Sequence, residues 1–325
     1  MSNDAASGTS RRQFLGRAAG AAAAVAGAGV GAGAFAGSAA AADQRSYTAG
    51  RFLLDIDGAS VGRIAGMDGG ALENAVVLDP IGSDQIQHKH IAGFKWSECT
   101  VQVGSAIGAG MHSWIKAAFD HGFDPSSKRT ASVSKLNASD VEIARRSFHD
   151  ALITEVTIPA LDIHSTAAGV QVAVTFSSQD VTDSPPSGAP AVLGKQKAWL
   201  PANFVFQLDG VDTSRVATID SFTWKCVAAP DGSLFLDVGD VGVTFPRASL
   251  PSWQRWYDGL SAGADDERDG TLTLVGANSG AVVTIGLSSC GVYRLSPDPA
   301  APNTRVKAEF YVERMGWDLK KGDKV

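Results

Sequence analysis

The amino-acid sequence predicts a mainly β protein made of two tandem copies of one domain, with one amphipathic helix among the strands of each copy. Three observations predict this class. Segments in both halves alternate apolar and polar residues with a period of two; four sequence blocks recur in the same order; and each half has one stretch of helical periodicity. The 325 residues, 44% of them hydrophobic, are enough for two domains with their own cores.

The repeat opens with a strand, a tight turn and a second strand. The stretch "RFLLDIDGASVGRI" (51–64) returns as "NFVFQLDGVDTSRV" (203–216), and both lead to an Asp-Gly pair, which hairpin turns favour. Asp55 and Asp57 could instead begin a calcium loop or a catalytic acid pair. Because Gln207 replaces Asp55 in the second copy, we interpret Asp55 as the polar side of a strand and Asp57-Gly58 and Asp209-Gly210 as hairpin turns.

A helix is expected next in each copy, over 110–121 and 250–261. The alignment places Ser113-Trp114 on Ser252-Trp253. Helical spacing puts apolar residues on one face of each helix: Met111, Trp114, Ile115, Ala118 and Phe119 in the first, and Leu250, Trp253, Trp256 and Tyr257 in the second. No convergent polar groups accompany these faces, so they are predicted to pack rather than to bind a cofactor.

Two strand-forming blocks complete the repeat. "SFHDALITEVTIPALD" (147–162) falls opposite "GLSSCGVYRLSPDPAA" (286–301), and "GVQVAVTFSSQD" (169–180) opposite "RVKAEFYVERMG" (305–316). The proline-rich stretch 184–201 between the copies is typical of an exposed linker. The sequence therefore predicts a first domain over 43–183 and a second over 202–325.

The N-terminal segment 1–42 is predicted to be a twin-arginine signal peptide. Its signature residues are Arg11, Arg12, Phe14 and Leu15. The Ala/Gly run that follows is less hydrophobic than a membrane helix, which favours cleavage over anchoring. Ala40 and Ala42 fit an A-x-A cleavage site. We expect an exported protein, periplasmic or extracellular, with no stable membrane anchor.

The charge of the chain argues against nucleic-acid binding. Cleavage after residue 42 would remove three arginines and one aspartate and change the net charge from −6 to −8. No cluster of basic residues interleaved with aromatics is present. The three cysteines, Cys99, Cys226 and Cys290, are widely spaced and form no C-x-x-C motif, so they are expected to be small buried hydrophobes.

The order of the blocks resembles that of the tail tube proteins of phages and contractile injection systems. The segments that carry the resemblance in the first copy are "FLLDIDG", "IAGFKWSECTVQVG" (91–104), "MHSWIKAAF" and "RRSFHDALITEVTIPALD", followed by a last strand. The resemblance implies a small β-barrel or sandwich with one packed helix in each domain. It also implies a non-enzymatic role without cofactors, in rings of six domains that stack into tubes. With two domains per chain, a homotrimer would form a pseudo-hexameric ring, which could join tail-like assembly partners.

Candidate chemical sites are few. His88 and His90 lie two residues apart and could share one face of a strand as metal ligands, but no third ligand is evident and a solvated loop is the favoured interpretation. The acidic run "ADDERDG" (264–270) is expected to be a charged turn between helix and strand. No G-x-S-x-G, H-E-x-x-H or Walker A motif occurs, so no catalytic residue is assigned. Because twin-arginine substrates often carry cofactors, an exported binding module or enzyme on a duplicated β scaffold stays the alternative.

Overall fold

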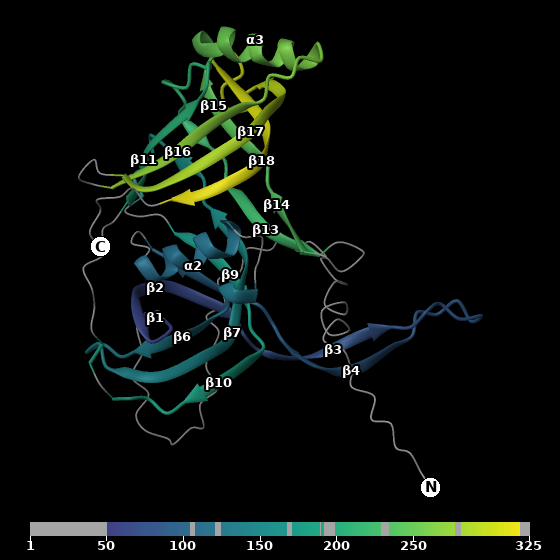
Figure 1. Cartoon of the computed structure of the whole chain (residues 1–325), viewed down its shortest axis with the longest axis vertical. Helices are drawn as coiled ribbons and strands as arrows, with labels where there is room; N and C mark the ends of the chain where they lie inside the picture. The colour runs from purple at the N-terminus through teal and green to yellow at the C-terminus, as the bar shows by residue number, and fades with distance from the viewer. Residues whose placement is uncertain are drawn as a thin grey trace.

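The computed structural model describes residues 51–104, 108–120, 125–167, 171–188, 190–191, 199–228, 234–276 and 281–318. Of these residues, 61% lie in strands and 12% in helices, which confirms the predicted fold class. The chain forms one closed six-stranded barrel and one nearly closed, barrel-like sheet, each with one α-helix (Figure 1).

The first copy is the closed barrel. Six strands follow one another around it: β1 (Phe52–Ile56), β2 (Ala59–Gly69), β5 (Cys99–Val103), β9 (Val172–Ser177), β7 (Glu142–Ile158) and β6 (Arg129–Leu136), which pairs again with β1. Helix α2 (Ala109–Asp120) and the short 3-10 helix η1 (Pro125–Ser127) connect β5 to β6. Two small strands lie outside the barrel: β8 (Leu161–Asp162) and β10 (Asp180–Ser184), which pairs with β7.

The second copy repeats this order. Its sheet runs β11 (Trp199–Leu208), β16 (Arg268–Gly276), β17 (Ala281–Pro297), β18 (Arg305–Asp318), β15 (Val241–Pro246) and β12 (Thr218–Ile219), with β8 of the first copy added at the end. The 3-10 helix η2 (Arg247–Ser249) and helix α3 (Leu250–Ser261) connect β15 to β16. Strand β11 begins at Trp199, within the range 184–201 that was expected to be a linker.

Each copy also has a hairpin inserted between two strands of its sheet: between β2 and β5 in the first copy, and between β12 and β15 in the second. The hairpin of the first copy is β3 (Leu72–Leu78) with β4 (Lys89–Trp96), and that of the second is β13 (Phe222–Ala228) with β14 (Leu234–Val238). The pairing registers of the two copies correspond as well. Arg129 lies opposite Ala151 between β6 and β7, as Arg268 lies opposite Cys290 between β16 and β17. This equivalence of order and register supports the predicted duplication.

The first Asp-Gly turn is confirmed, and the second differs from the prediction. Asp57 and Gly58 have φ angles of 50° and 79°, the left-handed values that a two-residue hairpin turn requires, and β1 pairs with β2. Asp209-Gly210 also turns, but β11 does not pair with β12. The segment after the turn is held away from β11 at Asp212. The Asp212 carboxylate accepts hydrogen bonds from Ser214 Oγ (2.6 Å) and from Ser249 Oγ beside α3 (3.1 Å). The second sheet therefore stays open between β11 and β12.

The interpretation of Asp55 as the polar side of an alternating strand is wrong. Its side chain is buried, with 7% of the residue exposed, and its carboxylate lies 3.1 Å from Arg145 Nη2. The same guanidinium lies 2.8 Å from Glu142, which also accepts a hydrogen bond from Ser134 Oγ. Asp55 thus belongs to a polar cluster of the first barrel, whereas Gln207 in the second copy is exposed.

The predicted helices are confirmed, but their alignment is shifted by almost one turn. The Trp114 indole donates to the carbonyl of Ser127 (3.0 Å), and the Trp256 indole donates to that of Asp266 (2.8 Å). Trp114 packs against Phe176 of β9, as Trp256 packs against Phe310 of β18. Trp114 therefore corresponds to Trp256 and not to Trp253, because residues three apart share a helix face and either tryptophan fits the pattern.

The polar cluster of the first barrel predicts a defined loss of stability in acid. Burial raises the pKa of Glu142, but hydrogen bonds from Arg145, the Ser187 amide and Ser134 outweigh it and lower the pKa from 4.5 to about 2. A carboxylate with a depressed folded pKa stabilises the fold above pH 4.5, and this contribution is lost as the pH falls toward 2. In urea unfolding at pH 7 and pH 3, Glu142→Gln should lose about 2 kcal/mol less between the two pH values than the unmodified protein.

The exposed Glu313 on β18 provides the control, because Glu313→Gln removes a carboxylate from the surface. This variant should lose as much stability in acid as the unmodified protein. An equally large acid loss in Glu142→Gln would contradict the assigned role of the cluster.

Candidate assembly interface

The two copies join by strand addition. Hairpin β13–β14 leaves the second copy and adds to the outer edge of β7, so the sheet of the first barrel continues as β7-β13-β14 (Figure 1). The pairing is antiparallel, with Phe222 opposite Ile158 and Trp224 opposite Val156. In return, β8 of the first copy pairs with β12 of the second. Each copy thus contributes at least one strand to the sheet of the other.

Aromatic side chains anchor this junction. Trp224 is fully buried, and its ring lies 5.7 Å from that of Trp317 at the end of β18 and 6.3 Å from Phe222. The Trp317 ring in turn lies 6.2 Å from His112 of α2. His112 is itself buried, with 8% of the residue exposed. The helix of the first copy therefore faces the second copy, while α3 lies at the far end of the molecule (Figure 1).

Polar contacts set the register of the junction. Thr157 and Thr223 hydroxyls lie 2.9 Å apart across the two strands, and Ser221 Oγ donates to the Ile158 carbonyl at 2.9 Å. On the same face of the sheet, Lys225 Nζ lies 3.7 Å from the Glu155 carboxylate. The junction thus combines backbone pairing, a buried tryptophan and one charged pair.

The equivalent hairpin of the first copy pairs with no strand edge within the described part of the chain. Strands β3 and β4 form a two-stranded sheet of their own that projects away from the barrel (Figure 1), and we call residues 72–96 the projecting hairpin. Cross-strand partners share a face, and the pairs Leu72–Trp96, Asn74–Phe94 and Val76–Ile91 place large apolar side chains on one face. Leu72 is 57% exposed and Phe94 72% exposed.

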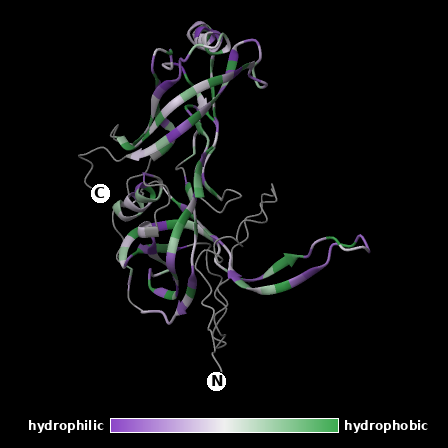
Figure 2. Cartoon of the chain, turned by 45° about the vertical axis from the view of Figure 1, so that its right-hand side comes forward, coloured by the Kyte–Doolittle hydropathy of each residue, from purple (hydrophilic) through white to green (hydrophobic). Residues whose placement is uncertain are grey.

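Apolar residues continue toward the tip of the projecting hairpin, where Ile81 and Ile86 are exposed (Figure 2). A contiguous apolar surface of this kind marks an interaction site or an aggregation hazard. The sequence analysis did not predict this apolar face, because the alternation in β4 is interrupted by a bulge opposite Asn74–Val76.

The second copy has a free strand edge where the first copy is filled. The C-terminal half of β7 pairs with β9 on one side and with β13 on the other. The corresponding half of β17, up to Pro297, pairs only with β18 among the described strands. Among the residues that the structure describes, the second copy therefore has one unpaired strand edge, and the first copy has one hairpin that pairs with no other strand.

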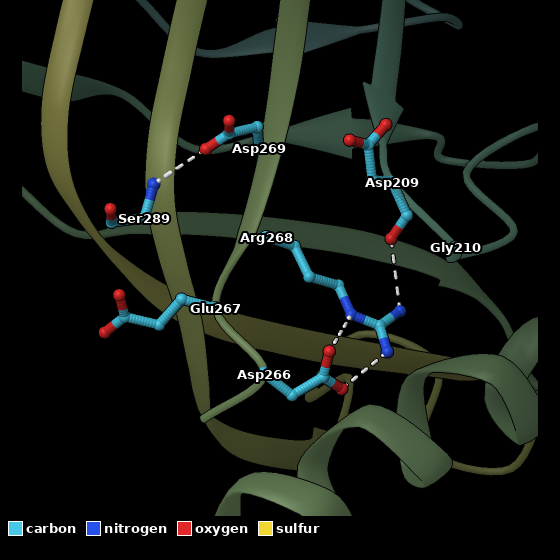
Figure 3. A pocket seen from close by; sticks show the side chains of 7 residues that line it. All are labelled: Asp209, Gly210, Asp266, Glu267, Arg268, Asp269 and Ser289. Atoms are coloured by element: carbon cyan, nitrogen blue, oxygen red, sulfur yellow. Dashed lines mark hydrogen bonds and ion pairs between the residues drawn. The ribbon is translucent and has the colours of Figure 1, made fainter. Parts of the chain in front are cut away.

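A surface hollow of about 440 Å³ lies beside the Asp209-Gly210 turn (Figure 3). Four of its charged side chains, those of Asp266, Glu267, Arg268 and Asp269, have partners. Arg268 pairs with Asp266 at 2.7 Å and donates to the Asp209 carbonyl, and Asp269 accepts from the Ser289 amide. The Glu267 carboxylate accepts from Tyr311 Oη at 2.6 Å, a bond that with burial raises the pKa of Tyr311 to about 12. These contacts fix the acidic turn between α3 and β16, where the sequence placed it.

The candidate metal ligands contact separate carboxylates. His88 Nε2 lies 2.7 Å from Asp84, and His90 Nδ1 lies 3.1 Å from Asp79. Strand β4 begins at Lys89, so His88 precedes the strand. Across the described residues, no group of three or more His, Cys, Asp or Glu side chains converges as a metal site would need.

The remaining sequence predictions concern the signal segment and the cysteines. Arg11, Arg12, Phe14, Leu15, Ala40 and Ala42 lie outside the described residues. Cys99 and Cys290 are buried, as predicted, while Cys226 is half-buried. Burial raises the pKa of the Cys290 thiol to about 12 and that of Cys226 to about 11, so both are protonated at neutral pH. Within the described ranges, no helix combines the length and apolarity needed to cross a membrane.

No protein-family model matches this chain, and no curated protein is detectably similar to it. Similar solved structures come from contractile injection systems. The tube-terminating cap of the anti-feeding prophage is 18% identical, with a TM-score of 0.33, over 45% of this chain and 95% of that one. The sheath/tube terminator of the extracellular contractile injection system PVC is 14% identical, also at 0.33, over 44% and 99%. A chain of the PVC sheath-tube complex is 13% identical, at 0.31, over 44% and 93%.

The junction predicts that Trp224 is a main source of stability between the copies. Trp224→Ala should lower the free energy of unfolding by about 3–5 kcal/mol, because it leaves a cavity beside Trp317. Urea unfolding followed by far-ultraviolet circular dichroism measures the change without relying on tryptophan fluorescence.

Phe235, an exposed residue of the same hairpin, supplies the matched control. Phe235→Ala should change stability by less than about 0.5 kcal/mol. Equal effects of the two substitutions would show that the buried indole does not anchor the junction.

Proposed function

We propose that this chain is a non-enzymatic structural protein that assembles, after export, as a homotrimer in a pseudo-hexameric ring. The observation that carries the proposal is the junction inside the chain, where the hairpin of one copy fills the strand edge of the other. The equivalent hairpin of the first copy and the equivalent strand edge of the second copy have no such partner among the described residues. A second and a third chain can supply the missing partners.

The ring follows from the geometry of repeated head-to-tail contacts. A contact that joins two different surfaces of like subunits generates a closed ring when the rotation closes, and an open filament when it does not. The two tube-like domains, 43–183 and 202–325 in the sequence, would be related by the same rotation as neighbouring chains. Six domains per ring, as the family resemblance implies, then correspond to three chains.

The positions of the two unpaired surfaces support this proposal. Helix α2 lies against the second copy, whereas α3 and the free edge of β17 belong to the copy that has no further neighbour. The projecting hairpin extends sideways from the first barrel (Figure 1). Stacking of such rings into tubes, and tail-like partners at their ends, would extend the assembly.

Export by the twin-arginine route is part of the proposal. Because this route carries folded proteins, a chain with two completed copies can cross the membrane before it assembles. The ring or tube would then form in the periplasm or outside the cell.

The assembly state tests this proposal. Mature protein (residues 43–325) should elute with the mass of three chains in size-exclusion chromatography with light scattering, and negative-stain images should show six-lobed rings. A monodisperse monomer at high concentration would contradict the proposal.

A double substitution on the projecting hairpin links assembly to this surface. Leu72→Ser with Phe94→Ser should abolish the ring and leave the thermal unfolding midpoint of the monomer unchanged, because both side chains are exposed in the chain. Leu234→Ser with Phe235→Ser alters the exposed residues of the docked hairpin and should keep the ring. Rings that survive the first substitution and not the second would exclude the projecting hairpin as the contact.

A further inference from the structure

The charged pair at the junction fixes the register of a docked hairpin. In the pairing of β13 with β7, Lys225 lies opposite Glu155, Trp224 opposite Val156 and Thr223 opposite Thr157. The ammonium and carboxylate groups of the first pair are 3.7 Å apart and partly exposed. A register slip of one residue would turn each side chain to the other face of the sheet.

Hydrogen bonds at the base of each hairpin give the residue equivalence between the two hairpins. The Ser97 amide donates to the Ala71 carbonyl, and the Gly239 amide donates to the Thr223 carbonyl, both at 2.8 Å. The next pairs are Leu72–Trp96 and Trp224–Val238. Leu72 therefore corresponds to Trp224, and the following residue, Glu73, corresponds to Lys225.

The acceptor strands can be aligned in the same way. Ile153 of β7 lies opposite Phe176, and Val292 of β17 lies opposite Phe310. Three residues further on, Val156 faces Val174 and Leu295 faces Ala308. Glu155 of β7 therefore corresponds to Arg294 of β17.

We propose that the projecting hairpin docks on β17 of a second copy of this chain with Glu73 opposite Arg294 and Leu72 opposite Leu295. The inference rests on the proposed ring and names its contact. The pair Glu73–Arg294 repeats the pair Lys225–Glu155 with the two charges exchanged. Both correct dockings thus bring opposite charges together.

The exchanged charges also disfavour both incorrect dockings. The projecting hairpin on β7 would place Glu73 against Glu155, and β13 on β17 would place Lys225 against Arg294. Like charges directly opposite each other on neighbouring strands are destabilising. The charge pattern therefore assigns each hairpin to one strand and makes first and second copies alternate around the ring.

The surroundings of Arg294 leave it able to take a second carboxylate. In the chain its guanidinium lies 3.1 Å from Glu309, its neighbour on β18. Glu309 is shared with Lys307, whose ammonium lies 3.7 Å away and also pairs with Asp220 at 2.6 Å. Arg294 is 63% exposed in its side chain, and a guanidinium has five donors, so Glu73 can approach from the free side.

Burial of apolar side chains supplies the binding free energy, and the charged pairs select the partner strand. Leu72 is more than half exposed, while the equivalent Trp224 is fully buried at the junction. Docking would cover Leu72 and the adjoining apolar face of the projecting hairpin. The β17 edge would gain backbone pairing up to Pro297, as β7 does up to Ile158.

Charge substitutions test the assignment by sedimentation of mature protein at low salt, with the trimer–monomer equilibrium as readout. Glu73→Lys should raise the concentration at half dissociation by about fivefold or more, because it places like charges opposite each other. Arg294→Glu should act in the same direction. The double variant Glu73→Lys with Arg294→Glu should return the midpoint to within about twofold of the unmodified protein.

Glu313→Lys on β18 changes the net charge equally at an exposed site and should leave the midpoint unchanged. Glu73→Gln adds a variant that removes attraction without adding repulsion, and it should fall between the unmodified protein and Glu73→Lys. Circular dichroism and thermal unfolding confirm that each chain is folded.

The outcomes separate this inference from the proposed function. A trimer that both single variants leave intact, or that the double variant fails to restore, would overturn the Glu73–Arg294 pairing while the ring stands. An unmodified protein that stays monomeric would overturn the ring itself, and the pairing with it.

Discussion

The addition of β13 to the edge of β7 is the interaction on which the arrangement of this molecule depends. An exposed strand edge invites pairing, and the chain satisfies one such edge with a hairpin from its own second half. The fully buried Trp224 adds apolar burial to the backbone hydrogen bonds. Because the two halves share one strand order, pairing one edge internally leaves one hairpin and one strand edge unpaired among the described residues, and the proposed assembly rests on these two surfaces.

The two copies have diverged around this shared plan. The first barrel closes through the Asp57-Gly58 turn and holds a buried cluster of Asp55, Glu142 and Arg145. The second shows no such cluster among its described residues, and its sheet stays open beside β12 and pairs with β8 of the first copy. Each copy thus depends on the other for part of its sheet, which ties the stability of the monomer to its junction.

Local patterns in the sequence predicted the strands, both helices, the order of the repeat and the first turn, because these follow from nearest-neighbour preferences. Features set by distant partners were missed. Asp55 is buried because Arg145 reaches it from another strand, and the Asp209-Gly210 hairpin fails because Asp212 is held by Ser249. The pairings between the two copies could not be predicted either. Hydropathy shows which face of a strand is buried, but it does not show which strand pairs with its edge.

The central claim is that the strand edge of β17 receives the hairpin of another chain, and disulfide trapping tests it most directly. Thr223 and Thr157 hydroxyls are 2.9 Å apart at the junction, and the corresponding residues are Ala71 and Ser296. Mature protein with Cys226→Ser, Ala71→Cys and Ser296→Cys should oxidise to covalent dimers and closed trimers, with no larger species on a non-reducing gel. Monomer alone, or an open-ended ladder beyond the trimer, would contradict the account.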